Sequence, residues 1–309
     1  MSETVIEVNK LVKEYGDLRA VDDLDFEVQA GEVFSMLGPN GAGKTTTVEI
    51  LECIRDATSG RVRILDLDVT KQSSEIIKRV GVLPQKFDAF DLLTVKENID
   101  YFAQMFDHHL EADHLVEIVS LEDKSDELFR TLSGGMKQRV GVAISMVNDP
   151  EIIFLDEPTT GLDPRARRDV WEVVKDLRTQ GKTVILTTHY MEEAEVLSDR
   201  VAIMNQGKFK VIDSPRNIID HYGKKSVCTI KGGGKTAFDL LSQNGDSVEM
   251  KGEDIIVTLE GKRHLSKVIM MLEENEVYYE EVLLQKSNLE DVFLSLTGKK
   301  LTEGVDEID

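Results

Sequence analysis

The sequence predicts an α/β protein whose phosphate-binding core is interrupted by a helical segment and followed by a small α+β domain. Three observations predict this architecture. Short apolar runs alternate with loops in the first part of the chain, and one of them leads directly into residues 38–46, GPNGAGKTT. From about residue 89 to residue 149 the apolar spacing changes to the period of about 3.6 that helices show. After residue 222 a second series of short strands and helices begins.

Composition and charge limit the functions that the chain can have. It has 309 residues, of which 41% are hydrophobic, enough for one full-sized domain and a smaller one. No run approaches the roughly 18 apolar residues of a membrane span, and the first residues do not read as a signal peptide, so we expect a soluble, cytoplasmic protein. The net charge is −21. Because such a surface repels phosphate backbones, we expect no direct binding to nucleic acid.

Apolar runs and alternations predict the strands of the core. Runs without polar interruption are typical of parallel strands that are buried on both faces, and alternating runs are typical of half-buried strands. The predicted strands are residues 5–8, 24–28, 32–37, 80–83, 152–155, 184–187 and 201–204. A turn is expected at residues 205–207, where the sequence reads NQG.

Capping signals predict the helices of the inserted segment. Thr94 and Glu97 have the spacing of a capping box and predict a helix that runs through Phe106. Ser133 precedes another helix, which we expect to end near Ser145. The segment 89–149 is therefore expected to form a helical subdomain within the core.

The last third of the chain predicts a separate unit. Its expected elements are a strand at 226–231, a helix at 236–243, strands at 247–250 and 255–259, a helix at 262–274 and a strand at 277–284. This βαββαβ order fits a ferredoxin-like fold. A closing helix follows, for which Ser287 and Glu290 have capping-box spacing. We expect domains at residues 1–222 and 223–300, and an acidic, flexible tail at 301–309.

The glycine-rich stretch matches the phosphate-loop pattern G-x-x-x-x-G-K-[ST]. Its glycines let backbone N–H groups turn toward a phosphate, and a helix predicted for residues 44–55 would add its dipole. Lys44 would reach the β- and γ-phosphates, and the Thr45 hydroxyl would bind Mg²⁺. The loop residues predicted to contact ATP are Gly38, Pro39, Asn40, Gly41, Ala42, Gly43, Lys44, Thr45 and Thr46.

Two carboxylates end the predicted strand 152–155. Ligands of parallel sheets bind beyond the carboxyl ends of the strands, so Asp156 and Glu157 are expected at the nucleotide. Asp156 would hold Mg²⁺, and Glu157 would orient the attacking water and take its proton.

A second anion site is predicted in the helical segment. In Leu132-Ser133-Gly134-Gly135 the serine and two glycine N–H groups stand at the start of a helix. One chain cannot easily bring this site to its own Lys44 loop, whereas two chains arranged head to tail can. Ser133, Gly134 and Gly135 are therefore expected to bind the nucleotide of a second copy.

Taken together, these motifs resemble those of the ATP-binding-cassette (ABC) ATPases. The resemblance covers about residues 4–220 and implies a P-loop (RecA-like) core that hydrolyses ATP with Mg²⁺. The further residues that carry it, in the family's order and near its spacing, are Tyr15, Gln85, residues 132–139 (LSGGMKQR), Gly161-Leu162-Asp163 and His189.

The resemblance also implies a role for each of these side chains. Tyr15 would stack on adenine, and Gln85 would contact Mg²⁺ and the attacking water. His189 would contact the γ-phosphate, and Asp163 would lie at the seam of an ATP-sandwiched dimer. With Lys44 and Glu157, Gln85 and His189 form the expected catalytic set.

The C-terminal segment and the signature (residues 132–139) narrow the resemblance to one branch of the family. Residues 288–298 (NLEDVFLSLTG) resemble the C-terminal helix of ATPases from drug-resistance and sodium exporters, and Met136 within the signature fits that branch. This implies a subunit that drives a separate membrane permease at the inner face of the cell membrane, with residues 85–95 transmitting the movement. The transported substance stays open. The alternatives are a non-transport ABC ATPase acting on ribosomes or DNA, and a nucleotide-dependent regulatory subunit.

Overall fold

The computed structural model describes residues 3–223, 225–260 and 262–298. Contacts divide the chain into two units, the first reaching Arg216 and the second beginning at Asn217. Within the described residues, no helix combines the length and the apolar character needed to cross a membrane.

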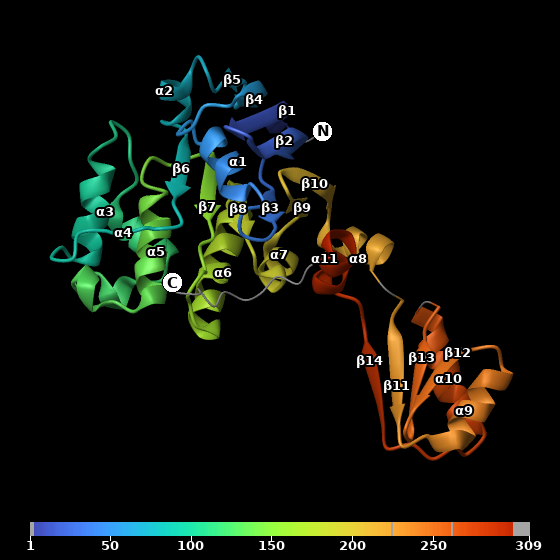
Figure 1. Ribbon diagram of the computed structural model, residues 1–309. Coiled ribbons are helices and arrows are strands. Elements are labelled where there is room, and N and C mark those ends of the chain that lie inside the picture. Colours follow the sequence, from blue (N-terminus) through green and yellow to red (C-terminus); the bar gives the residue numbers. More distant parts are fainter. Residues whose placement is uncertain (1–2, 224, 261, 299–309) are drawn as a thin grey trace. The chain divides into compact units, whose positions relative to one another are not determined.

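A six-stranded sheet forms the centre of the first unit (Figure 1). Its strands are β3 (Val33–Leu37), β6 (Val80–Leu83), β7 (Ile152–Asp156), β8 (Thr183–Thr188), β9 (Arg200–Asn205) and β10 (Lys208–Asp213). Their order is β10-β9-β3-β8-β7-β6, and all pairings except β10 with β9 are parallel. The carboxyl ends of the five parallel strands therefore lie at one edge of the sheet. The predicted core strands are confirmed.

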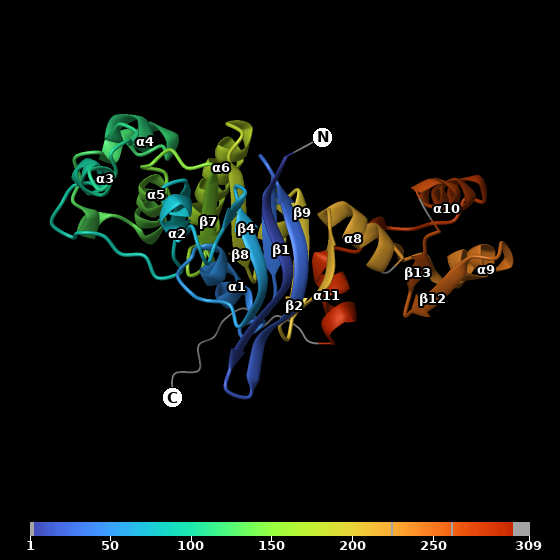
Figure 2. The same cartoon turned by 90° about the horizontal axis from the view of Figure 1, so that it is seen from above.

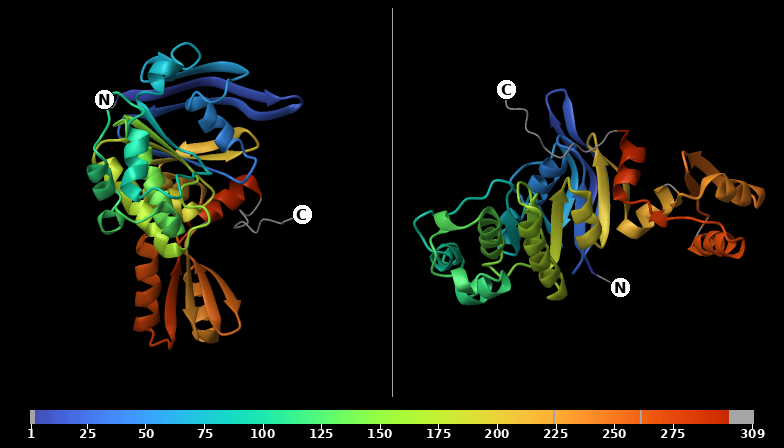
Figure 3. Two further views of the ribbon diagram at one scale, coloured as in Figure 1. Left: turned by 90° about the vertical axis from the view of Figure 1, so that its left-hand side faces the viewer. Right: turned by 90° about the horizontal axis from the view of Figure 1, so that it is seen from below.

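A second sheet packs on one face of the first. It consists of β1 (Thr4–Tyr15), β2 (Leu18–Gln29), β4 (Ser59–Ile64) and β5 (Leu67–Asp68). Figure 3 shows β1 and β2 as a long antiparallel hairpin. The core between the two sheets joins Ile6 of β1, Phe34 and Met36 of β3, and Val48 of helix α1 (Lys44–Leu51), all of them buried. Alternate residues of β3 point to opposite faces, as the period of two requires.

Helices cover the other face and form the inserted subdomain. The helices α3 (Val95–Ala103), α4 (Ala112–Ile118) and α5 (Gly134–Ile144) group to one side of the strands in Figure 2, and α6 (Pro164–Thr179) and α7 (Met191–Leu197) follow in the chain. They share one buried apolar cluster with the sheet. The predicted capping box is confirmed, because Thr94 Oγ1 accepts from Glu97 N at 3.1 Å and Glu97 Oε2 accepts from Thr94 N at 2.8 Å.

The second unit has the strand order of a ferredoxin-like fold. After α8 (Pro215–Tyr222) come β11 (Val227–Lys231), α9 (Gly234–Gln243), β12 (Ser247–Lys251), β13 (Asp254–Thr258), α10 (Lys262–Glu274), β14 (Glu281–Gln285) and α11 (Leu289–Thr297). The sheet order is β12-β13-β11-β14, with every neighbouring pair antiparallel. Residues of α9 and α10 pack on Cys228 and Ile230 of β11. The predicted βαββαβ order is confirmed.

Several predicted element ends are wrong. The strands predicted at 5–8 and 24–28 are only parts of β1 and β2, which have twelve residues each, and α3 ends at Ala103 rather than at Phe106. Helix α1 stops at Leu51 rather than near Arg55, because Cys53 has a φ of 60°, which no helix tolerates. Strand β14 starts at Glu281, four residues later than predicted. The cap of α11 is shifted by one residue, since Asn288 Oδ1, not Ser287, accepts from Asp291 N at 3.0 Å.

The buried carboxyl of Glu52 yields a prediction about stability. The residue follows α1, is 6% exposed, and its Oε1 has no hydrogen-bond partner among the described residues. Burial, with the charges of Asp156 and Glu49, raises its pKa from 4.5 to about 8. The folded chain therefore holds a proton that the unfolded chain releases, and this stabilisation is complete below pH 4.5 and lost as the pH rises through about 8.

In Glu52→Gln the titrating group is absent, so the free energy of unfolding should fall less between pH 6 and pH 9 than in the native chain. Urea unfolding at several pH values measures this. Glu75→Gln, on the surface of α2 (Ser73–Ile76), is the matched control and should follow the native pH dependence. Parallel curves for Glu52→Gln and the native chain would contradict the prediction.

Candidate functional site

Four neighbouring strands end at the same edge of the central sheet. The loop after β3 leads to Lys44, the residue after β7 is Glu157, the residue after β8 is His189, and Gln85 follows β6 by two positions. Such an edge is where α/β sheets bind their ligands. A cavity of about 320 Å³ opens there. It is lined by Asn40, Gly41, Ala42, Gly43, Lys44, Thr45, Thr46, Gln85 and Glu157.

The glycine loop is held by contacts with two other segments. Gly207 N donates to Ala42 O at 2.9 Å, and a Cβ added at Gly43 would lie 2.3 Å from Ala20 O of β2. Gly43, with a φ of 104°, is the N-cap of α1, and no side chain caps that helix. The first N–H groups of α1 are thus left to an anion, as a phosphate-binding loop requires.

The ammonium of Lys44 lies beneath this loop. Its Nζ donates to Gly38 O at 2.8 Å and to Pro39 O at 3.3 Å, and lies 3.4 Å from Glu157 Oε1. The side chain is 4% exposed. Burial lowers the pKa of Lys44, while the charges of Glu157 and Asp156 oppose that shift. The cation is held at the floor of the cavity, where phosphate oxygens can replace the loop carbonyls as its partners.

The carboxylate of Glu157 is contacted by residues that follow several of the strands. Its Oε2 accepts from Gln85 Nε2, Thr160 Oγ1 and His189 Nδ1, each at 3.1 Å. Its backbone has a φ of 50°, and its N–H donates to both the carbonyl and the hydroxyl of Thr187. These contacts fix the direction in which the carboxylate points.

The same neighbours keep Glu157 ionised. Burial alone would raise the pKa of this carboxyl, but the hydrogen bond from His189 and the charge of Lys44 outweigh it and lower the pKa to about 2. Because the carboxylate can only accept, His189 must carry its proton on Nδ1. An ionised, oriented carboxylate at the mouth of a phosphate loop is equipped to receive a proton from water.

A magnesium ion fits the residues beside Glu157. Asp156 is 5% exposed and accepts a hydrogen bond from Thr187 Oγ1. Burial raises the pKa of Asp156, and hydrogen bonds from Thr187 and Thr45 oppose that rise. The hydroxyl of Thr45, the carboxylate of Asp156 and the amide oxygen of Gln85 are hard oxygen donors of the kind that Mg²⁺ prefers.

The remaining predicted residues lie outside the cavity lining. Ser133 Oγ accepts from Met136 N at 3.3 Å and caps α5. A Cβ on Gly135 would lie 2.6 Å from Ala166 Cβ, so the start of α5 packs directly on α6. Asp163 Oδ1 accepts from the N–H groups of the first turn of α6 at 2.9 and 3.0 Å. The structure brings these dimer-seam candidates next to one another, not to the Lys44 loop.

Tyr15 also stands apart from the lining residues. Tyr15 is an exposed residue at the end of β1. Lys13 Nζ and the Arg55 guanidinium lie 5.2 and 5.4 Å from the ring centroid. The ring therefore has cationic neighbours, and its stacking on adenine stays a prediction.

Two hydroxyl residues of the site were not predicted from the sequence. The Thr160 hydroxyl donates to the Glu157 carboxylate. The Thr187 hydroxyl donates to the Asp156 carboxylate and accepts from the backbone N–H of Glu157. Their positions in the sequence could have indicated them, because Thr160 closely follows Asp156 and Glu157, and Thr187 precedes His189 by two residues.

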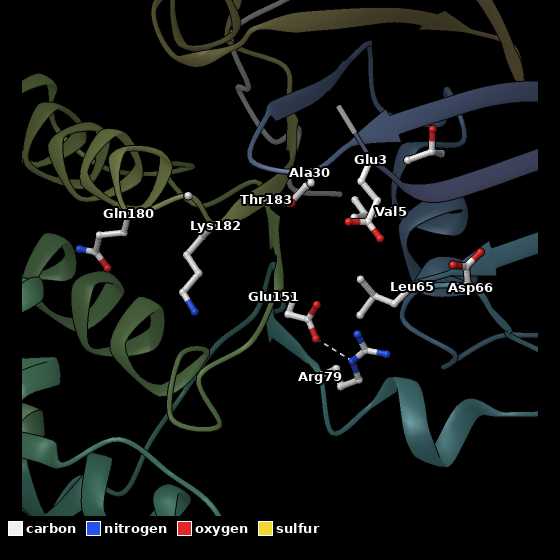
Figure 4. Close-up of a pocket in the computed structure, with 12 residues that line it drawn as sticks. Glu3, Val5, Ala30, Leu65, Asp66, Arg79, Glu151, Gln180, Lys182 and Thr183 are labelled. Atoms are coloured by element: carbon white, nitrogen blue, oxygen red, sulfur yellow. Dashed lines mark hydrogen bonds and ion pairs between the residues drawn. The ribbon is translucent and has the colours of Figure 1, made fainter. Parts of the chain in front are cut away.

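A larger hollow, of about 360 Å³, lies at the opposite, amino end of the parallel strands (Figure 4). Its two cationic residues, Arg79 and Lys182, are each paired with a carboxylate. Arg79 Nε lies 2.6 Å from Glu151 Oε1, and Lys182 Nζ donates to Asp149 Oδ1 at 2.6 Å. Because its cations are already paired with carboxylates, this hollow offers no comparable place for a phosphate.

Comparison with known proteins decides the family. The ABC transporter family pattern matches residues 21–160. A relative from Burkholderia lata, "Nod factor export ATP-binding protein I", is 38% identical over 96% of this chain and 98% of its own. The chain belongs to the ABC transporter ATP-binding family. The predicted ABC ATPase of the exporter-type branch is confirmed.

Further matches to this ABC ATPase agree with it in length or in fold. The "Daunorubicin resistance ATP-binding protein DrrA3" of Streptomyces coeruleorubidus is 36% identical over 96% of this chain and 97% of its own. Among solved structures, the ATP-binding cassette MJ0796, a dimer in a post-hydrolysis state with ADP and phosphate, matches with a TM-score of 0.61 and 25% identity. That match covers 68% of this chain and 98% of MJ0796.

Two loop glycines provide a matched test of the phosphate loop. Both Gly43 and Gly41 have positive φ, so alanine costs roughly 1–2 kcal/mol of backbone strain at either position. Only at Gly43 does the new Cβ collide with another segment, at Ala20 O; at Gly41 nothing lies within 4 Å. Gly43→Ala should therefore weaken MgATP binding at least about tenfold more than Gly41→Ala does. Equal losses in titration calorimetry would contradict this account of the loop.

Proposed function

We propose that this ABC ATPase powers a separate membrane permease, as the ATP-binding subunit of an exporter, at the inner face of the cell membrane. The observation that carries the proposal is the meeting of Lys44, Gln85, Glu157 and His189 at one strand edge, in a chain that aligns over nearly its whole length with ATP-binding proteins of exporters. The site provides the hydrolysis, and the exporter relatives supply the kind of work to which it is coupled.

The hydrolytic step follows from the position of Glu157. The carboxylate takes a proton from a water whose oxygen forms the new bond to the γ-phosphorus, while the bond from that phosphorus to the bridging oxygen breaks and ADP leaves. Lys44 balances phosphate charge, and Gln85 and His189 hold the carboxylate and reach toward the water and the γ-phosphate. Thr45, Asp156 and Gln85 would hold Mg²⁺, which would supply neutralisation of phosphate charge.

The complete site requires two copies of the chain. Ser133, Gly134 and Gly135 start a helix of eleven residues but do not line the cavity that contains Lys44. An anion at that helix start would be the γ-phosphate of ATP on a second chain, with Asp163 at the seam. The dimeric structure of MJ0796 supports this proposal.

Exposed apolar residues of the segment that follows Gln85, and on and after α3, form the proposed contact with the permease. Phe90 and Leu92 are 45% and 69% exposed, and Tyr101 and Met105 on and after α3 are 46% and 61% exposed. The rings of Phe90 and Tyr101 pack edge to face, 4.7 Å apart. A cluster of exposed apolar side chains, such as this pair of rings, is typical of protein contacts. We call these four residues the helical-subdomain patch.

Replacing a patch residue should separate partner binding from ATP chemistry. Leu92→Ser is expected to reduce the amount of a multi-span membrane protein that co-purifies with the tagged chain from gently solubilised cells, because it removes exposed apolar contact area. Leu18→Ser, at a residue 64% exposed on β2, is the matched control and should leave capture unchanged. Hydrolysis by the isolated chain should be the same in both variants. Capture of ribosomal proteins or nucleic acid in place of a membrane protein would contradict the transporter proposal.

A further inference from the structure

We infer that Glu193 is a positioning residue that couples the dimer-facing helix α6 to His189 and Glu157. The inference rests on the proposed function and extends it, because it names the connection through which the seam between two chains reaches the hydrolytic site. Glu193 itself is no part of the cavity lining.

The carboxylate of Glu193 joins segments that lie far apart in the sequence. It is fully buried, and its Oε1 accepts from Thr159 Oγ1 at 2.8 Å and from Trp171 Nε1 at 2.9 Å. Thr159 belongs to the loop after β7, Trp171 to α6, and Glu193 to the first turn of α7. Together with the Thr188 hydroxyl, these donors oppose the rise that burial causes in the pKa of Glu193. A buried carboxylate loses stabilisation when one of its donors moves away.

Each of these segments also carries a residue of the site or of the seam. The neighbour of Thr159 is Thr160, which donates to Glu157 Oε2. Helix α6 begins at the cap residue Asp163 and touches Gly135 through Ala166. A displacement of the seam therefore moves α6, and the shared carboxylate transmits that movement to the loop that orients Glu157.

A second contact runs from α6 to the histidine segment. The guanidinium of Arg167 lies 3.9 Å from the ring centroid of Tyr190, a favourable cation–π distance. The Tyr190 ring lies 4.2 Å from that of His189. Arg167 Nε is buried and has no hydrogen-bond partner among the described residues, and the charge of Arg167 opposes the rise that burial causes in the pKa of Glu193. Both contacts connect the same helix to the same catalytic pair.

Tryptophan fluorescence can report on this connection. Trp171 is its single tryptophan, so the intrinsic emission comes from the indole that donates to Glu193. If MgATP closes the dimer and moves α6, the emission of the native chain should change on addition of MgATP. This change and the ATPase rate of the native chain test the proposed function, separately from the role of Glu193.

The role of Glu193 is tested by variants that keep Trp171. Glu193→Gln retains an oxygen acceptor for both donors and should keep the MgATP-dependent emission change and most of kcat. Glu193→Leu removes the acceptor; we expect about a tenfold lower kcat with little change in KM, and loss of the emission change. Native kcat and a native emission response in Glu193→Leu would overturn the inference.

A milder variant covers the case in which Glu193→Leu does not fold. Thr159→Val removes one donor while keeping the shape of the side chain, and should lower kcat severalfold with little change in KM. Thr179→Val is its control, because the Thr179 hydroxyl is exposed and donates to Asp176 O within α6, and it should behave as the native chain. Equal kcat values for the two threonine variants would overturn the inference as well.

Discussion

Parallel pairing of β3, β8, β7 and β6 brings four strand ends to one edge of the sheet, and the reactive groups depend on that edge. The loop after β7 carries Glu157, and the segments after the other three strands each contribute one group that meets it: the ammonium of Lys44, the imidazole of His189 and the amide of Gln85. The strands are buried on both faces, so the edge cannot shift without disturbing both apolar cores. The site is therefore held by the packing of the sheet as well as by its own hydrogen bonds.

Because the charged side chains of the site are buried, they depend on their contacts within the protein. Lys44, Asp156 and Glu157 are each at most 6% exposed, so none can rely on water for solvation. They are held by one another, by loop carbonyls and by threonine hydroxyls, which is the condition under which buried charges persist. When phosphate enters the cavity it meets donors that are already oriented, and little reorganisation is required at the moment of reaction.

Much of this organisation could be predicted from the sequence, and the failures have physical reasons. Continuous apolar runs identified β3, β6, β7 and β8, and with them the positions of Lys44 and Glu157, because these strands are buried on both faces. The partnership of Glu157 with Thr160 depends on a φ of 50° that no local pattern encodes. Helix α6 was not predicted, although Asp163-Pro164 is a good helix start, and Glu193 acquires its role only through contacts across the fold.

The central claim is that Glu157 acts as the base in an ATP site shared by two chains. Light scattering of Glu157→Gln with MgATP, at concentrations well above nucleotide affinity, tests it most directly, since the amide keeps the shape of the site but cannot take the proton. The account predicts ATP binding like that of the native chain, hydrolysis lowered by at least about a hundredfold, and a stable dimer. A Glu157→Gln chain that hydrolyses ATP at the native rate, or that stays monomeric with MgATP bound, would contradict it.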